Sequence, residues 1–481
     1  MFKNFTSLLG FSPNKTWRRQ LENRNAHPVS LLILVIIGLL GYNGVSFVGI
    51  LALMLGVTMF EFVKRMDQGL PLLHVAALIA VLQWVVGAWL TYNVDLFFST
   101  YDMRVDSDTY FSYAIPGTAA YLLGLLGVGG ALRQRGLLWK VDRSHFLQLG
   151  MILALLGFAG GLAAELFPGG LAYVFFLISQ LRYVAALYFI FSRHRLRWVF
   201  TAFTVLPLFT GTAATGMFHD LLLWMGILVC YVYAMQKRRL WVTTLILIIG
   251  ISAGFTIQGI KRSYRDKVWN KEEGSLVKEI KIFWEDPHAM FGEENLSNSI
   301  IRMNQGWIIA AIMQNVPSSE PFAWGETVKE AVMASLLPRV ISEDKANSGG
   351  QAEFRRFTGL PIGDTTAMGL SLLGEAYVNF GKLLGIVVMF GFGTLISIPY
   401  SLCLRFSIRH PDFYFWMPII FCSVIKAESN LVTTLNSLSK GSLLVFGLYW
   451  IISMRLFPAT GIHLKAARIR QPHRIRELKI R

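Results

Sequence analysis

The stretch Leu383–Leu404, LLGIVVMFGFGTLISIPYSLCL, contains 22 residues and no charged side chain. A helix needs about 20 apolar residues to cross the hydrocarbon core of a bilayer, so this stretch predicts one transmembrane helix. Similar apolar runs recur along the chain, and we expect about twelve such helices. The expected spans are 29–43, 45–62, 72–91, 110–131, 146–166, 169–191, 198–213, 217–235, 240–258, 383–404, 412–429 and 437–455. The predicted fold class is therefore an all-α polytopic membrane protein.

The composition supports the same fold class. Hydrophobic residues make up 54% of the 481 residues, and charged residues only 15%. Soluble domains contain about 25% charged residues, and disordered chains contain few apolar residues, so the composition excludes both classes. The three cysteines, Cys230, Cys403 and Cys422, lie inside apolar runs. They form neither a disulfide framework nor a metal-binding pattern.

Positive charge collects on one side of the expected membrane. Lys and Arg cluster in segments on the same side as the N-terminus, including 64–65, 193–197 and 237–239, whereas the short turns on the other side contain only Arg104. Because cytoplasmic loops carry the excess of Lys and Arg, we expect both termini in the cytoplasm. This bias accounts for the formal net charge of +16 without a nucleic-acid partner. We expect the basic tail to lie on anionic membrane lipids.

The expected spans divide the chain into four parts. Residues 1–258 form an N-terminal membrane bundle of about nine helices, 259–381 a large extracytoplasmic loop, 382–457 about three C-terminal helices, and 458–481 the basic cytoplasmic tail. Long loops with their own structure are usually functional, so we expect the site in the loop.

Local sequence signals predict that the loop is largely helical. We expect helices near 276–284, 297–314 and 326–337. Coil is expected at 348–363, where glycine and proline recur. This helical loop would cover the outer end of the membrane bundle.

Cationic side chains in the loop suggest a site for an anionic lipid headgroup. The guanidinium group binds phosphate in bidentate geometry, and Arg302 lies in an apolar run where a free charge is costly. The candidates are Arg302, Arg339, Lys345, Arg355 and Arg356. The alternative is that these cations are solvated or paired with the acids of the same loop.

Glu375 is the candidate general base. Glu375 and Asn379 are four residues apart, share one helical face near the point where the chain re-enters the membrane, and flank Tyr377. A carboxylate in apolar surroundings can act as a general base. Alternatively, Glu375 accepts hydrogen bonds from loop amides at the start of the helix. The residues alone leave both interpretations open.

Arg182 is the most unusual charge within the expected spans. It lies near the middle of the span 169–191. A charge at this depth is a functional candidate by default, here for binding a diphosphate. The alternative is a purely structural pair with an acid of the bundle.

Short motifs in the loop resemble those of a known family. In chain order they are Ile301-Arg302, Pro321-x3-Gly325-x-Thr327, Leu337-Pro338-Arg339, Asp344-Lys345 and Gly374-Glu375-x-Tyr377-x-Asn379-Phe380-Gly381. This pattern resembles the bacterial O-antigen and exopolysaccharide repeat-unit polymerases, the Wzy-type oligosaccharide polymerases. The resemblance covers about residues 300 to 381, and elsewhere it rests on topology.

The resemblance implies a glycosyltransferase with a GT-C-like fold in the bacterial inner membrane, acting at its periplasmic face without a metal or other cofactor. Such enzymes transfer a glycan from undecaprenyl diphosphate to the non-reducing end of another lipid-linked repeat unit. Arg302, Arg339 and Lys345 would then bind the diphosphate with help from Arg355 and Arg356, and Glu375 would be the base. The expected catalytic residues are thus Glu375 and Arg302. Arg182, Tyr377 and Asn379 are further substrate-binding candidates. A chain-length co-polymerase is a possible partner in such pathways.

Three other functions remain open at this stage. An O-antigen ligase would transfer a finished glycan from the same carrier, but its loop is expected to supply an essential histidine. Here His288 is the only histidine between the ninth and tenth expected spans. A flippase for the same lipid is disfavoured because no internal repeat is evident. A non-catalytic membrane component is the third alternative.

Overall fold

The computed structural model describes residues 21–22, 26–44, 47–66, 69–94, 101–129, 131–132, 143–167, 169–215, 218–235, 245, 293–336, 350–363, 366 and 368–452. Apart from a pair of two-residue strands, β1 (Leu21–Glu22) and β2 (Ala131–Leu132), the regular structure of this part is helical. The expected span 240–258, the expected helix 276–284 and the basic tail lie outside the described residues, apart from Leu245.

The helices of the N-terminal half are α3 (Pro28–Tyr42), α4 (Phe47–Met66), α5 (Leu72–Ala80), η1 (Val81–Val86), α6 (Gly87–Asn93), α7 (Ser107–Gly127), α9 (Phe146–Leu166), α10 (Gly169–Ser179), α11 (Leu181–Phe191), α12 (Arg197–Thr215) and α13 (His219–Met235). Those of the C-terminal half are α17 (Glu293–Met303), α18 (Gly306–Asn315), α19 (Glu326–Leu336), α20 (Gln351–Thr358), α21 (Ser371–Arg409), η3 (Pro411–Trp416), α22 (Met417–Phe421), η4 (Cys422–Ile425), α23 (Leu431–Asn436), η5 (Ser437–Gly441) and α24 (Ser442–Tyr449).

Seven helical segments of the described chain are long and apolar enough to cross a membrane. They are Phe47–Met66, Leu72–Asn93, Phe146–Leu166, Leu171–Phe191, Arg197–Thr215, Ser371–Arg409 and Leu431–Ile452. Three shorter apolar segments accompany them, Pro28–Tyr42, Asp220–Tyr233 and Pro411–Ile425. The chain is therefore a helical, multi-pass membrane protein, as expected, and the full count of twelve spans stays a prediction.

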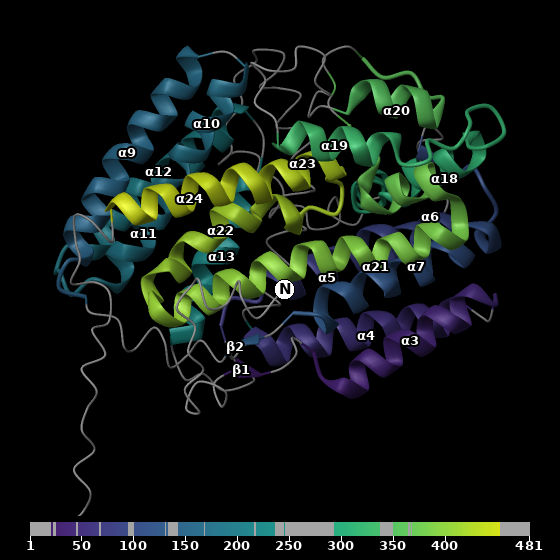
Figure 1. Ribbon diagram of the computed structural model, residues 1–481, viewed down its shortest axis with the longest axis horizontal. Coiled ribbons are helices and arrows are strands. Elements are labelled where there is room, and N and C mark those ends of the chain that lie inside the picture. The colour runs from purple at the N-terminus through teal and green to yellow at the C-terminus, as the bar shows by residue number, and fades with distance from the viewer. Residues whose placement is uncertain are drawn as a thin grey trace, which may run out of the picture.

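The long helix α21 extends across most of the molecule and packs along α7 (Figure 1). Their backbones touch at two glycines, since a Cβ atom at Gly124 would lie 2.2 Å from the carbonyl oxygen of Phe390, and one at Gly393 2.2 Å from that of Tyr121. Small residues allow this close approach of membrane helices. Helices α9 to α12 gather at the left in Figure 1, and α18 to α20 at the right.

Two expected spans are interrupted. The span 169–191 is divided at Gln180 into α10 and α11, and the Gln180 side chain accepts a hydrogen bond from Trp224 Nε1 at 2.9 Å. The span 412–429 is divided into η3, α22 and η4, after which the chain is non-helical until α23 begins. The Asn430 side chain caps α23 by accepting the Thr433 amide at 3.0 Å. A polar side chain thus lies at the break in the first span, and another caps the helix that follows the second.

The loop helices differ in two respects from expectation. The helix predicted at 297–314 is broken, because the Asn304 side chain donates to Thr91 Oγ1 at 2.8 Å and accepts the Gly306 amide at 2.7 Å. The coil predicted at 348–363 contains α20, so that prediction was wrong. Gly350 and Gly359 flank α20 with positive φ angles of 62° and 67°, and they mark its ends. The helix predicted at 326–337 is confirmed as α19.

Candidate functional site

A glycine kink divides α21 into a short arm, residues 371–380, and a long apolar part. Gly381 has φ 65° and ψ −162°, a conformation that is almost restricted to glycine. A Cβ atom there would also lie 3.2 Å from the ring of Phe322. The kink therefore requires glycine both for its backbone angles and for the contact with the loop.

Asn379, fully buried on the arm, binds the loop segment in front of α19. Its Oδ1 atom accepts the amide of Gly325 at 2.9 Å, and its Nδ2 atom donates to Thr327 Oγ1 at 2.7 Å and to the Glu375 carbonyl at 2.8 Å. Burial of an amide is favourable only when its polar atoms are satisfied, and here both are. Asn379 thus joins the arm to the first turn of α19.

Glu375, one turn before Asn379, is only 3% exposed. Its Oε1 atom accepts the hydroxyl of Thr327 at 3.1 Å, and its Oε2 atom accepts the amide of Leu431 at 2.8 Å. That amide belongs to the first turn of α23, where a carboxylate is favoured by the helix dipole. The predicted common face of Glu375 and Asn379 is confirmed. Glu375 also does what the alternative interpretation predicted, because it accepts a hydrogen bond from a backbone amide.

The contacts of Asn379 and Glu375 bring two separate sequence motifs together. The segment 321–327 supplies Gly325 and Thr327, and the segment 374–381 supplies Glu375 and Asn379. A backbone hydrogen bond of 2.9 Å from Ala323 to the Val378 carbonyl adds to the same contact. The two motifs therefore form one structural unit although about fifty residues separate them in the sequence.

A small cavity adjoins this unit and is lined by three carboxylates, Glu330, Glu353 and Glu375, with Thr327 and Asn430. Its volume of about 10 Å³ is roughly what one water molecule requires. Burial raises the pKa of the Glu330 carboxyl, and the neighbouring charges of Glu326 and Glu353 raise it further. The immediate surroundings of Glu375 are therefore acidic, although the sequence suggested a row of cations.

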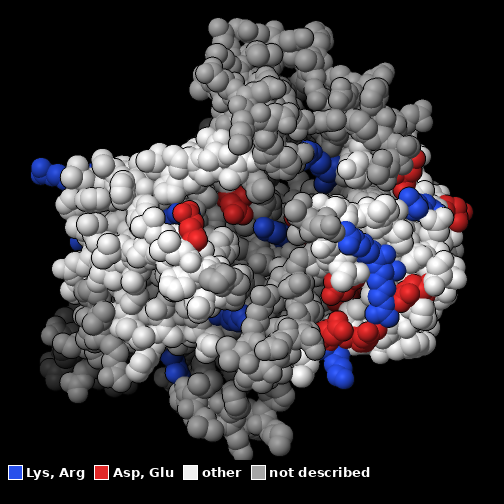
Figure 2. Space-filling view, turned by 90° about the horizontal axis from the view of Figure 1, so that it is seen from above, with Lys and Arg blue, Asp and Glu red and all other residues white. Residues whose placement is uncertain are grey.

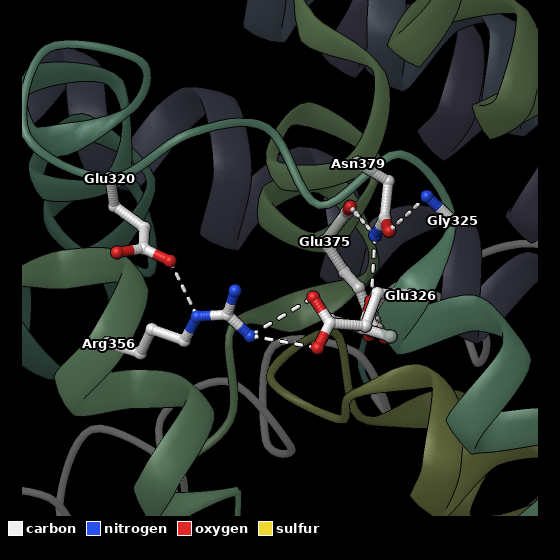
Figure 3. Close-up of polar contacts among 7 residues, drawn as sticks. Glu320, Gly325, Glu326, Arg356, Glu375 and Asn379 are labelled. Carbon is white, nitrogen blue, oxygen red and sulfur yellow. Dashed lines mark hydrogen bonds and ion pairs between the residues drawn. The ribbon is translucent and has the colours of Figure 1, made fainter.

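Two of the predicted cations lie on α20 and are engaged by the loop itself. The Arg356 guanidinium bridges Glu320 at 2.6 Å and Glu326 at 3.1 Å, as Figure 3 shows. These hydrogen bonds to the two carboxylates raise the pKa of Arg356. Arg355 donates to the carbonyl of Ile362. Arg356 is therefore paired with acids of the same loop, which was the alternative stated for these cations.

Arg302 lies in the last turn of α17, which packs against α6, and is half-buried. The hydrogen bonds of Glu375 come from α19 and α23 instead. The two residues expected to be catalytic are thus positioned by different sets of helices. Arg339 and Lys345 lie outside the described residues. So does Asp364, which with Glu428 is the next candidate for the base if Glu375 is not.

Tyr377 and Arg182 occupy different environments. Tyr377 is half-buried and its ring packs edge-on against Tyr113 at 5.1 Å between centroids. Arg182 follows the break at Gln180, and its guanidinium lies 5.0 Å above the ring of Tyr183. The Nε atom of Arg182 is buried and has no hydrogen-bond partner in the described part of the chain. None of the contacts described for Arg182 reaches the loop unit.

The sequence interpretation missed two acidic residues at the site, Glu330 and Glu353, and gave Thr327 a place in a motif but no role. These residues surround Glu375, but they belong to helices whose relative position no local pattern encodes. It also missed Lys382, which follows the kink, donates to Ser112 Oγ at 2.9 Å and lies 5.0 Å above the ring of Tyr42. A lysine directly before a long apolar run is the signal that marks it as an interfacial cation.

One face of the molecule carries both signs of charge. Figure 2 shows acidic and basic side chains intermixed at its right-hand end, the end at which α18 and α20 lie in Figure 1. The rest of the described surface in that view shows few charges. Among the described residues no cluster of three or more His, Cys, Asp or Glu side chains suits a metal ion.

Comparison with known proteins places the chain in a family. The family model described as a domain of unknown function, DUF8712, matches residues 95–403, more than half of the chain. The chain belongs to this family. The DUF8712 match includes α17 to α20 and the arm of α21, and thus every residue of the unit around Glu375 except those of α23. No curated protein and no solved structure shows a significant match.

Proposed function

We propose that this protein is a glycosyltransferase of the bacterial inner membrane that polymerises lipid-linked oligosaccharide repeat units at the periplasmic face. In this proposal the donor is a glycan on undecaprenyl diphosphate, and the acceptor is the non-reducing end of another lipid-linked repeat. Both termini are cytoplasmic, in accordance with the distribution of Lys and Arg. The fold is GT-C-like, with about twelve spans.

One observation supports the proposal most. The two motifs that carry the resemblance to Wzy-type polymerases, 321–327 and 374–381, contact each other through Asn379, Thr327 and Glu375. Residues that serve a common site are expected to converge in this way, whereas accidental short matches have no reason to do so. The contact lies beside the kink of α21, where the apolar part of this helix begins.

The proposed reaction requires a base and a group of cations. Glu375 removes the proton from the acceptor hydroxyl, the acceptor oxygen bonds to the anomeric carbon of the donor, and the bond from that carbon to the diphosphate oxygen breaks. Undecaprenyl diphosphate leaves with the bonding electrons. A carboxylate has about four lone-pair sites, so Glu375 can accept this proton beyond its two present hydrogen bonds.

Cations stabilise the diphosphate as its negative charge develops. We assign this role to Arg302, Arg339 and Lys345, with Arg355 and Arg182 as further contacts. Arg356 first has to exchange its ion pairs with Glu320 and Glu326 for the substrate, which is feasible because the pairs are partly exposed. Tyr377 and Asn379 shape the arm on which the base lies.

Glycan gels of a strain that lacks the protein test the proposal. The strain is complemented with wild type, Arg302→Ala, Arg339→Ala or the control Arg197→Ala, which alters an arginine at the start of α12. We expect wild type and the control to restore long chains. The two loop variants should leave single repeats on the terminal acceptor, at unchanged protein level.

Two other outcomes would contradict the proposal. If the strain lacks both long chains and single capped repeats, the protein is a ligase or a flippase. If Arg302→Ala and Arg339→Ala both produce normal polymer, these residues do not bind the diphosphate. In that case the acidic unit around Glu375 has to be explained without the cations of the loop.

A further inference from the structure

A groove on the opposite side of the molecule from the loop helices is built from α3 and α4, which form an edge of the bundle (Figure 1). Its volume is about 480 Å³, within the range of pockets that hold small ligands. The walls are mainly apolar and include Ile33 from α3 with Ala52 and Phe60 from α4. Such a surface on a membrane helix pair faces acyl chains.

The depth of the groove comes from small residues. Gly56 lies on the exposed face of α4, and a Cβ atom there would meet no other atom within 4 Å. Ala52 lies one turn away on the same face of the helix. The missing side chains leave room for a chain-like ligand that lies along the helix pair.

One end of the groove is polar and has cations beside it. The Nδ1 atom of His27 accepts the amide of Val29 at 3.3 Å, so in the neutral ring the proton is on Nε2, which becomes a donor. On α4, Lys64 lies 5.7 Å above the ring of Phe60, which lines the groove, and Arg65 follows it. These groups offer positive charge and a hydrogen-bond donor where the apolar walls end.

Among the described residues that contact this end, the acid Glu61 is already satisfied by the protein. The Glu61 side chain is buried and accepts both the Ser30 hydroxyl at 2.5 Å and the His27 amide at 3.0 Å. It joins the two helices and is withdrawn from the surface. The polar end therefore presents cations and donors, which complement an anionic headgroup.

We propose that this groove binds one anionic glycerophospholipid, with an acyl chain between α3 and α4 and its phosphate beside Lys64 and His27. The apolar length of the groove receives the chain, and the cations select the headgroup. This site is distinct from the site of polymerisation, and its occupant is not a substrate. The bound lipid would fill the space between α3 and α4 at the edge of the bundle.

Lipid binding to the purified full-length protein in maltoside detergent tests the proposal. Native mass spectrometry would compare phosphatidylglycerol with phosphatidylcholine that carries the same acyl chains. We expect phosphatidylglycerol to bind more tightly, and Lys64→Gln to weaken it about five-fold, the effect of one cation near an anionic headgroup. Phosphatidylcholine binding should not change in this variant.

A leucine that fills the groove supplies the decisive variant. Gly56→Leu should abolish the selective binding of phosphatidylglycerol without loss of stability, because leucine also favours the helix. The matched control is Gly391→Leu on α21, where a Cβ atom also meets nothing within 4 Å. The proposal is overturned if both lipids bind equally, if Gly56→Leu binds like wild type, or if the groove holds a second copy of the chain, seen as a dimer that Gly56→Leu dissociates.

Discussion

Two buried acids near opposite ends of α21 look alike at first but differ in their surroundings. Asp412, just beyond the end of the helix, accepts the hydroxyls of Tyr188 at 3.0 Å and Tyr449 at 2.7 Å and is fully buried among aromatic rings. Glu375, near the start, also accepts two hydrogen bonds. It lines a cavity shared with two further carboxylates, however, and Asp412 lines neither of the two cavities described here.

This difference separates a structural acid from a candidate catalytic one. Two tyrosine hydroxyls and a packed aromatic shell leave Asp412 no access to a substrate. Glu375 is bound by a threonine hydroxyl and a backbone amide, and the adjoining cavity has room for about one water molecule. Burial and hydrogen bonding alone do not indicate function, whereas access and the convergence of motifs do.

The largest expected effect is the difference in enzymatic activity between variants of Glu375 and of Asp412. Glu375→Gln should lower the rate of polymerisation by about 10² to 10⁴, the usual contribution of a general base, because the amide cannot take the acceptor proton. Asp412→Asn should leave the activity of the folded protein unchanged. It should destabilise the protein by about 1 to 3 kcal/mol, since an amide nitrogen cannot accept a tyrosine hydroxyl.

Chain extension by the purified variants and their thermal unfolding measure both effects. Normal chain lengths with Glu375→Gln would place the base elsewhere, and Glu428 in the segment before α23 becomes the next described candidate. Equal loss of activity in both variants would remove the distinction between the two ends of α21.

Removal of the Thr327 hydroxyl, beside Glu375 near the start of α21, should cause a smaller loss of activity. Thr327→Val keeps the shape of the side chain but removes the group that joins Asn379 Nδ2 to Glu375 Oε1. One such hydrogen bond contributes about 1 kcal/mol, so we expect roughly a five-fold loss of activity. The matched control is Thr434→Val on α23, whose hydroxyl donates to the Asn430 carbonyl at 3.0 Å and not to Glu375. Assays of both variants at equal protein level measure the effect, and equal activities would contradict a positioning role for Thr327.

The smallest effect concerns Glu330 at the edge of the cavity. Its pKa is raised in the folded protein, so folding favours its protonated form and the ionised form opposes folding. This penalty is absent below the unfolded pKa and grows as pH rises through the folded pKa. Glu330→Gln should therefore stabilise the protein by less than about 1 kcal/mol at about pH 8, and hardly at about pH 4, below the ordinary pKa of a glutamate.

Thermal unfolding of Glu330→Gln at these two pH values measures the difference. The control is Glu165→Gln at the end of α9, outside the acid cluster, measured at the same two pH values. A larger stabilisation at the acidic pH would reverse the sign and contradict the role assigned to the neighbouring carboxylates.

Local patterns were sufficient to predict some elements of the loop. Helix α19 has the acid Glu326 in its first turn, as expected of a helix N-terminus, and it ends within one residue of the predicted end. The common face of Glu375 and Asn379 on α21 follows from their spacing of four residues. Apolar runs likewise identify the seven long apolar segments. These features depend on helix geometry within a single stretch of sequence.

The parts that were missed depend on contacts between distant residues. The break at Asn304 is stabilised by Thr91, more than two hundred residues away. Helix α20 was mistaken for coil because Gly350 and Gly359, which mark its ends, are also the usual signals of a turn. The acids around Glu375 come from α19 and α20, so their proximity becomes visible only in the folded chain.

The kink at Gly381 also limits the height above the membrane at which a substrate must present its reactive group to Glu375. If the hydrocarbon layer begins after Lys382, as the apolar run 383–404 indicates, Glu375 lies six residues before the kink. Leu383, the first residue of that layer, is eight residues beyond Glu375, so at 1.5 Å per residue Glu375 stands at most about 12 Å above it. A bilayer's headgroup region is roughly 5 to 7 Å deep on each side. In the proposed reaction, chemistry at Glu375 is therefore limited to the first sugar or two above a lipid phosphate, and the growing glycan would have to extend away from the membrane after each addition.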